Sequence, residues 1–82
     1  MHELGITRNI VAIVEEAAQG RRVVRVVLEV GKLAGVMPDA ITFCFDVLCK
    51  GTTAEGAALS IVELDGAELK IKTMEVEELS CA

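Results

Sequence analysis

The sequence predicts an α/β domain of the α+β type, in which two helices pack on a three-stranded mixed sheet in the order α-β-α-β-β. The 82 residues make a single small domain, 1–82, without a linker or an internal repeat. Apolar residues alternate between helical and strand spacing along the chain, and two packed layers bury them. The central strand–helix–strand unit indicates a right-handed crossover and a parallel pair. The Asp65-Gly66 dipeptide indicates a hairpin, which adds an antiparallel strand.

The first predicted helix covers residues 4–19, where apolar side chains recur at helical spacing. Gly20 is a suitable stop, because glycine tolerates the left-handed conformation that follows a helix. The predicted buried stripe consists of Ile6, Ile10, Ile13, Val14 and Ala17.

The first predicted strand covers residues 22–31, which are mostly β-branched. Its apolar face consists of Val24, Val26, Leu28 and Val30. The opposite face is half polar and consists of Val23, Arg25, Val27 and Glu29. We expect the valines of that second face, together with Val62, to offer a surface for another chain.

The second predicted helix covers residues 38–50, after a loop that contains Gly31, Gly35 and Pro38. Proline fits the first turn of a helix, and the neighbouring Asp39 suits the helix dipole. The predicted buried stripe consists of Ile41, Cys44, Phe45 and Leu48.

Two further strands are predicted at residues 57–64 and 67–77. Leu59 and Ile61 share one face of the first of these strands, since side chains alternate along a strand. In the last strand Leu69 and Ile71 share a face, whereas Met74 and Val76 have the opposite parity. Either a bulge near Lys72-Thr73 restores one register, or Met74 and Val76 belong to the second face.

Composition excludes several classes of function. The chain has 8 basic and 13 acidic residues, a net charge of −5, and only 2% aromatic residues. It therefore lacks the basic surface and the stacking rings that nucleic-acid binding requires. No apolar run approaches the roughly 18 residues of a membrane span, and the first residues do not resemble a secretory signal. With three cysteines and no CxxC pair, we expect reduced thiols and a cytoplasmic protein.

The candidate chemistry lies at the amino terminus. A lone histidine near a chain end is usually an inert surface residue, but His2 lies next to the free amine of Met1. The Met1 amine, the His2 backbone nitrogen and the His2 imidazole can chelate one metal in adjoining rings, and the Glu3 amide can supply a fourth nitrogen. A planar set of nitrogens selects Cu(II) or Ni(II) over zinc or magnesium.

The remaining reactive residues indicate no catalysis. Cys44 and Cys49 are five residues apart, a poor helical match, so we interpret Cys44 as a buried small hydrophobe and Cys49 as an ordinary thiol. Cys81 belongs to a tail that we expect to fray. Glutamates 15, 16, 75, 77 and 78 are expected to form a solvated face. Because no phosphate loop, nucleophile elbow or HExxH motif occurs, we expect no enzyme.

Three stretches resemble one family. The opening MHELGITRNIVAIVEEAA, the central VGKLAGVMPDAITFCFDVLCKGTTAEGA and the closing ELKIKTMEVE are similar to segments of the HypA family of nickel-incorporation metallochaperones. The resemblance covers about residues 1–77. It implies Ni(II) binding by Met1, His2 and Glu3, with His2 as the essential side-chain ligand. It also implies work with a maturation GTPase and delivery of nickel to the hydrogenase large subunit, or to urease.

One large departure limits what the resemblance implies. The family carries a zinc module with two CxxC-type pairs between its last two strands, and here only Asp65-Gly66 stands at that place. The chain is either a natural short relative or a form from which the module was deleted. With three cysteines and one histidine spread along the chain, no structural zinc is expected.

Two alternatives and one question of assembly remain open. The chain is alternatively an interaction module or scaffold without a metal role, or a small thiol enzyme using Cys44 or Cys49. A homodimer is possible through exchange of the hairpin at Asp65-Gly66, since short hinge loops allow such exchange. A single turn there is expected to close the sheet, and Gly66→Val is expected to destabilise it by opposing a positive φ.

Overall fold

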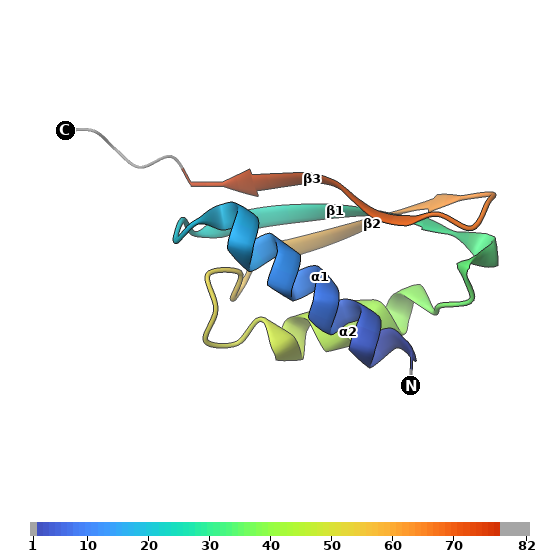
Figure 1. Cartoon of the computed structure of the whole chain (residues 1–82), viewed down its shortest axis with the longest axis horizontal. Helices are drawn as coiled ribbons and strands as arrows, with labels where there is room; N and C mark the ends of the chain where they lie inside the picture. Colours follow the sequence, from blue (N-terminus) through green and yellow to red (C-terminus); the bar gives the residue numbers. More distant parts are fainter. Residues whose placement is uncertain (1, 78–82) are drawn as a thin grey trace.

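The computed structural model describes residues 2–77, and it leaves the side chain of His2 undescribed. Its elements follow the predicted order (Figure 1). They are α1 (His2–Ala18), β1 (Val23–Gly31), the short 3-10 helix η1 (Lys32–Ala34), α2 (Pro38–Leu48), β2 (Ala58–Leu64) and β3 (Leu69–Val76). Both helices lie on the same side of the sheet and pack against each other (Figure 1). The predicted fold class is confirmed.

The sheet has the order β2-β1-β3, with β1 in the centre. Strand β1 runs parallel to β2 and antiparallel to β3, so the sheet is mixed, as predicted. The predicted hairpin, however, is wrong, because β2 and β3 are both paired with β1 and not with each other. The connection between them crosses over the end of β1, and neither Asp65 nor Gly66 has a positive φ. Dimerisation by exchange of this hairpin is therefore ruled out, because the hairpin does not form. Dimerisation by another route stays a prediction.

The crossing lies directly against Gly31, the last residue of β1. The Gly31 amide donates a hydrogen bond to the Glu68 carbonyl at 2.6 Å, and the Leu33 amide donates to the Gly66 carbonyl at 2.9 Å. A Cβ on Gly31 would lie 2.5 Å from the Gly66 carbonyl carbon and 2.7 Å from the Glu68 nitrogen. Gly31 is thus required by the close approach of another backbone, a role different from the loop punctuation that the sequence indicated.

Two bulges set the faces of the sheet. The predicted bulge in β3 is confirmed at Lys72, which is skipped between the Val27–Thr73 and Leu28–Ile71 pairs. A second register shift, at Val24, was not predicted. It turns Val24 outward, with 45% of its surface exposed, and turns Val23 into the core, so the predicted positions of these two valines are reversed.

The core lies between the sheet and the two helices. On α1 the buried stripe includes Val11 and Ala18 in place of the predicted Ile13 and Ala17, which are exposed. The buried apolar residues are Ile10, Val11, Val14, Ala18, Val23, Val26, Leu28, Val30, Ile41, Phe45, Cys49 and Ala54. Each large side chain of this kind contributes about 1.5–3 kcal/mol on burial. Thr7 is also fully buried, and its hydroxyl has no hydrogen-bond partner among the described residues.

The outer face of the sheet carries both apolar and charged side chains. Val23 is buried and so leaves the expected apolar surface, whereas Val27 and Val62 remain on it and the outward-turned Val24 is exposed. Cross-strand ion pairs lie beside them: Arg25 with Glu75 at 3.7 Å and Lys70 with Glu29 at 3.5 Å.

Candidate metal centre

Helix α1 begins at His2, so two of the three predicted ligands belong to its first turn. The first amide groups of a helix have no carbonyl acceptor within the helix itself. The backbone nitrogens of His2 and Glu3 can therefore lose their protons to a metal without removing a hydrogen bond from the body of α1. Met1 and the His2 side chain lie outside the described residues.

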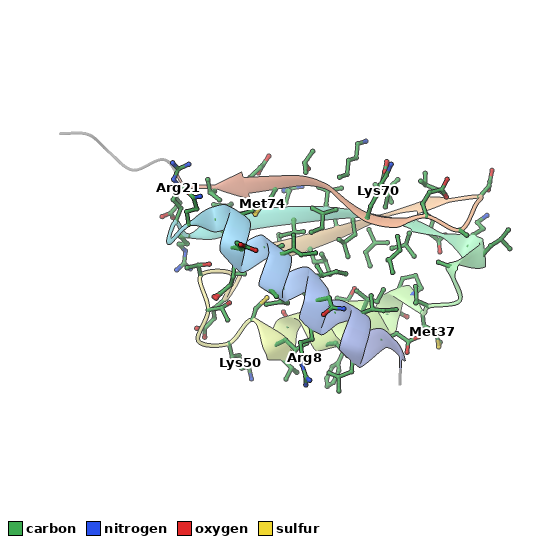
Figure 2. The ribbon with its side chains drawn as sticks, viewed as in Figure 1. Arg8, Arg21, Met37, Lys50, Lys70 and Met74 are labelled. Carbon is green, nitrogen blue, oxygen red and sulfur yellow. The ribbon has the colours of Figure 1, made fainter. Side chains whose placement is uncertain are left out.

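The Glu3 side chain has a defined position. It is half-buried, and its carboxylate oxygen Oε2 accepts a hydrogen bond from the Met37 amide at 3.0 Å. Figure 2 shows Met37 beside the first turn of α1, next to the start of α2. The contact joins residues 34 positions apart and fixes the start of α1 against the start of α2.

The start of α2 explains why a carboxylate fits there. Met37 is the N-cap residue, but its side chain accepts no capping hydrogen bond, and Pro38 follows in the first turn. The positive end of the α2 dipole therefore lacks a local side-chain cap. The carboxylate of Glu3 supplies negative charge at this end, together with Asp39 in the first turn of α2.

The two described cysteines, Cys44 and Cys49, do not form a second site. Cys49 is buried in the core, and burial, followed by the nearby Asp46 and Glu15 carboxylates, raises the pKa of its thiol from 9.0 to about 11. Cys44 is only half-buried, so the expected environments of the two thiols are reversed. Cys81 lies outside the described residues. Within residues 2–77, apart from the His2 side chain, no three His, Cys, Asp or Glu side chains gather closely enough to hold a metal.

The expected solvated face is found only in part, because Glu15 is half-buried and lies near the Cys49 thiol. Glu16, Glu75 and Glu77 are exposed, and the last two form ion pairs with Arg25 and Arg22 at 3.7 and 3.9 Å. Glu78 lies outside the described residues. Neither described helix is long and apolar enough to cross a bilayer.

Comparison with known proteins decides the family. Residues 1–69 match the model of the HypA family, described as hydrogenase/urease nickel incorporation metallochaperones. The chain belongs to the HypA family. Its relatives include hydrogenase maturation factors HypA from a Nostoc species, 64% identical over 66 residues, and from Trichodesmium erythraeum, 49% identical over 113 aligned positions. The family is one of metallochaperones rather than enzymes.

The HypA relatives are longer than this chain. The match to the Nostoc protein covers 80% of this chain and 58% of the relative. The Trichodesmium alignment covers 98% of this chain and 99% of the relative. Its 113 positions exceed the 82 residues here by 31, so at least that many positions have no counterpart in this chain.

The fold is shared with a solved structure. The solution structure of the nickel metallochaperone HypA from Helicobacter pylori superimposes with a TM-score of 0.68, covering 93% of this chain and 86% of that one. Because the two sequences are only 16% identical, this likeness shows the fold alone.

One feature of the centre was not found from the sequence, namely the contact between Glu3 and Met37. The available signal was the start of α2 itself, where proline and an acidic residue follow a methionine that cannot cap the helix. That pattern shows that an acceptor is needed from elsewhere in the chain, but it does not say which residue supplies it.

Proposed function

We propose that this chain is a nickel metallochaperone domain that binds Ni(II) through Met1, His2 and Glu3 and delivers it during maturation of NiFe hydrogenase or urease. The observation that carries the proposal is the family match, which begins at residue 1 and so includes the three ligands. The start of α1 at His2 supports it, because the two amides to be metallated lie in the first helical turn.

Each proposed ligand has a distinct part. Met1 gives its amine, His2 gives its imidazole and its backbone nitrogen, and Glu3 gives its backbone nitrogen. The amine has a pKa near 7.7–8.0 in model peptides, so protons compete with nickel in the physiological range. Affinity is therefore expected to fall as the pH drops from about 8 to about 6.

Nickel is the cargo in this proposal. Because copper binds such a set of nitrogen ligands more tightly, selectivity for nickel has to come from the availability of each metal and from the partner proteins. The proposed partners are the maturation GTPase of the nickel pathway and the hydrogenase large subunit; nucleic acid and membrane are not proposed. The cytoplasm is the proposed location, where free thiols such as Cys44 and Cys49 stay reduced.

Structural zinc is not part of the proposal. The sequence contains no CxxC-type pair of the kind that holds zinc in the family. We propose that this chain lacks the family's zinc module, which would be inserted at residues 65–66. Metal analysis of protein purified without chelator tests this, and stoichiometric zinc that persists through dialysis would contradict it.

The decisive experiment is Ni(II) titration of three variants, followed by the absorption band of planar nickel. His2→Ala and a Gly-Ser extension before Met1 are expected to abolish tight binding, because each removes a chelating group. Glu3→Gln is expected to weaken binding modestly. Glu16→Gln, an exposed glutamate at the other end of α1, serves as the control and is expected to bind as the parent does. If His2→Ala or the extended chain binds nickel like the parent, the proposed site is wrong and an interaction module without metal becomes the better reading.

A further inference from the structure

We infer that Glu3 acts as the positioning residue of the amino terminus, its carboxylate anchoring the first turn of α1 to the Met37 amide rather than coordinating the metal. This inference rests on the proposed nickel site. The geometry supports it directly, since Oε2 of Glu3 lies 3.0 Å from the Met37 nitrogen.

The anchor acts on the metal-binding segment because of where it attaches. Glu3 lies next to His2 in the chain, so a bond from its side chain to α2 limits the movement of the backbone nitrogens on either side of it. Terminal residues otherwise sample many conformations, and holding a chelating segment in one geometry removes part of the entropy lost on binding.

Electrostatics gives the same assignment. The carboxylate lies in the first turn of α1 and contacts the N-cap residue of α2, so it lies at the positive ends of two helices. A cation bound at these ends meets two unfavourable dipoles, and the negative charge of Glu3 offsets them. A carboxylate drawn away to bind the metal would leave the Met37 amide and the uncapped start of α2 without this acceptor.

The anchor is tested first without metal. In 15N-labelled protein the Met37 amide is expected to show a downfield proton shift and slowed hydrogen exchange. Glu3→Ala is expected to remove both, whereas Glu3→Gln, whose amide oxygen still accepts a hydrogen bond, is expected to keep part of them. Glu16→Ala on the exposed side of α1 is the control and is expected to leave the Met37 signal unchanged. Far-ultraviolet circular dichroism confirms that each variant is folded.

The role in nickel binding is tested next. Glu3→Ala is expected to weaken Ni(II) binding about tenfold, which corresponds to about 1.4 kcal/mol, with Glu3→Gln in between. The planar-nickel absorption band is expected to keep its position in both, because the ligands are unchanged. Planar Ni(II) is diamagnetic, so the Met37 amide can also be followed in the loaded protein, where its protection is expected to persist.

Three outcomes would overturn the inference: an unchanged Met37 amide in Glu3→Ala, equal nickel affinity of Glu3→Ala and the parent, or a displaced absorption band that places the carboxylate on the metal. Failure of the nickel site itself looks different. In that case His2→Ala binds nickel like the parent, while the metal-free Met37 signal still depends on Glu3.

Discussion

Substituting Gly31 by alanine tests the crossing of the β2–β3 connection over β1. The added Cβ would lie 2.5 Å from the Gly66 carbonyl carbon and 2.7 Å from the Glu68 nitrogen, and the Gly66 oxygen is also in its way. These are backbone atoms, so no side-chain rotation relieves the overlap. The crossing has to move away from β1, or β1 has to leave the sheet at its end.

The expected cost follows from what such a movement breaks. Overpacking by one methyl group costs about 1–3 kcal/mol in a close-packed site. The Gly31–Glu68 and Leu33–Gly66 hydrogen bonds both depend on this approach, and each contributes about 0.5–1.5 kcal/mol. Gly31→Ala should therefore lower the free energy of unfolding by about 2–6 kcal/mol, a large share of the roughly 4–12 kcal/mol that a domain of this size has.

Urea denaturation followed by far-ultraviolet circular dichroism measures this loss, since the chain has no Trp or Tyr to report by fluorescence. Gly5→Ala is the control: a Cβ added at Gly5 would have no described atom within 4 Å apart from its own helix backbone and chain neighbours, and alanine in α1 should stabilise by about 0.5–1 kcal/mol. Gly66→Ala is a second comparison, because its Cβ meets the flexible end of the Glu68 side chain at 2.7 Å and φ there is not positive. If Gly31→Ala is as stable as the parent within about 0.5 kcal/mol, the connection does not cross at Gly31, and the hairpin that the sequence suggested regains its place.

Two further predictions concern the core. Thr7→Val should raise the unfolding free energy by about 1 kcal/mol, because it removes a fully buried hydroxyl that has no partner within the part of the chain that the structure describes. A lower urea midpoint would show that the hydroxyl is in fact hydrogen-bonded. The pKa of Cys49 is raised from 9.0 to about 11 by burial and by Asp46 and Glu15, so the unfolded chain loses this proton first as the pH rises. The stabilisation by the protonated thiol is fully present below about pH 9 and is lost between about pH 9 and 11. The loss of unfolding free energy reaches about 1.4 kcal/mol at about pH 10 and at most about 2.7 kcal/mol at higher pH. Cys49→Ala should not show this component in parallel urea titrations, and an identical pH dependence in both proteins would contradict the assignment.

The order of elements could be predicted because it depends on local periodicity. The spacing of apolar residues placed both helices and all three strands, and the change of parity in the last strand located the bulge at Lys72. The bulge at Val24 left no such mark, because valines occupy both 23 and 24 and alternation cannot distinguish them.

Strand order could not be predicted because it depends on pairing between distant segments. Asp65-Gly66 is a typical hairpin turn, and local turn chemistry favoured pairing of the strands on either side. In the structure β1 lies between these two strands, with β2 on one edge and β3 on the other, and its Val26 and Leu28 are fully buried. A strand with apolar residues on nearly every position gains most from this place, and burial outweighed the local turn preference.

The segment between β1 and α2 connects these findings to the proposed metal centre. At one end the Leu33 amide bonds to the Gly66 carbonyl in the crossing, and at the other the Met37 amide bonds to the Glu3 carboxylate in α1. In both hydrogen bonds a backbone amide donates to an acceptor that is distant in the sequence. Apolar periodicity and turn motifs report only on local structure, so they could not predict these two contacts. The connection between β2 and β3 has only four residues, 65–68, and it places β3 beside β1, where the two strands pair through backbone hydrogen bonds. The three described strands thus pair within this short chain, although the Trichodesmium relative aligns over at least 31 further positions, and the start of α1 is held against α2 without any of them.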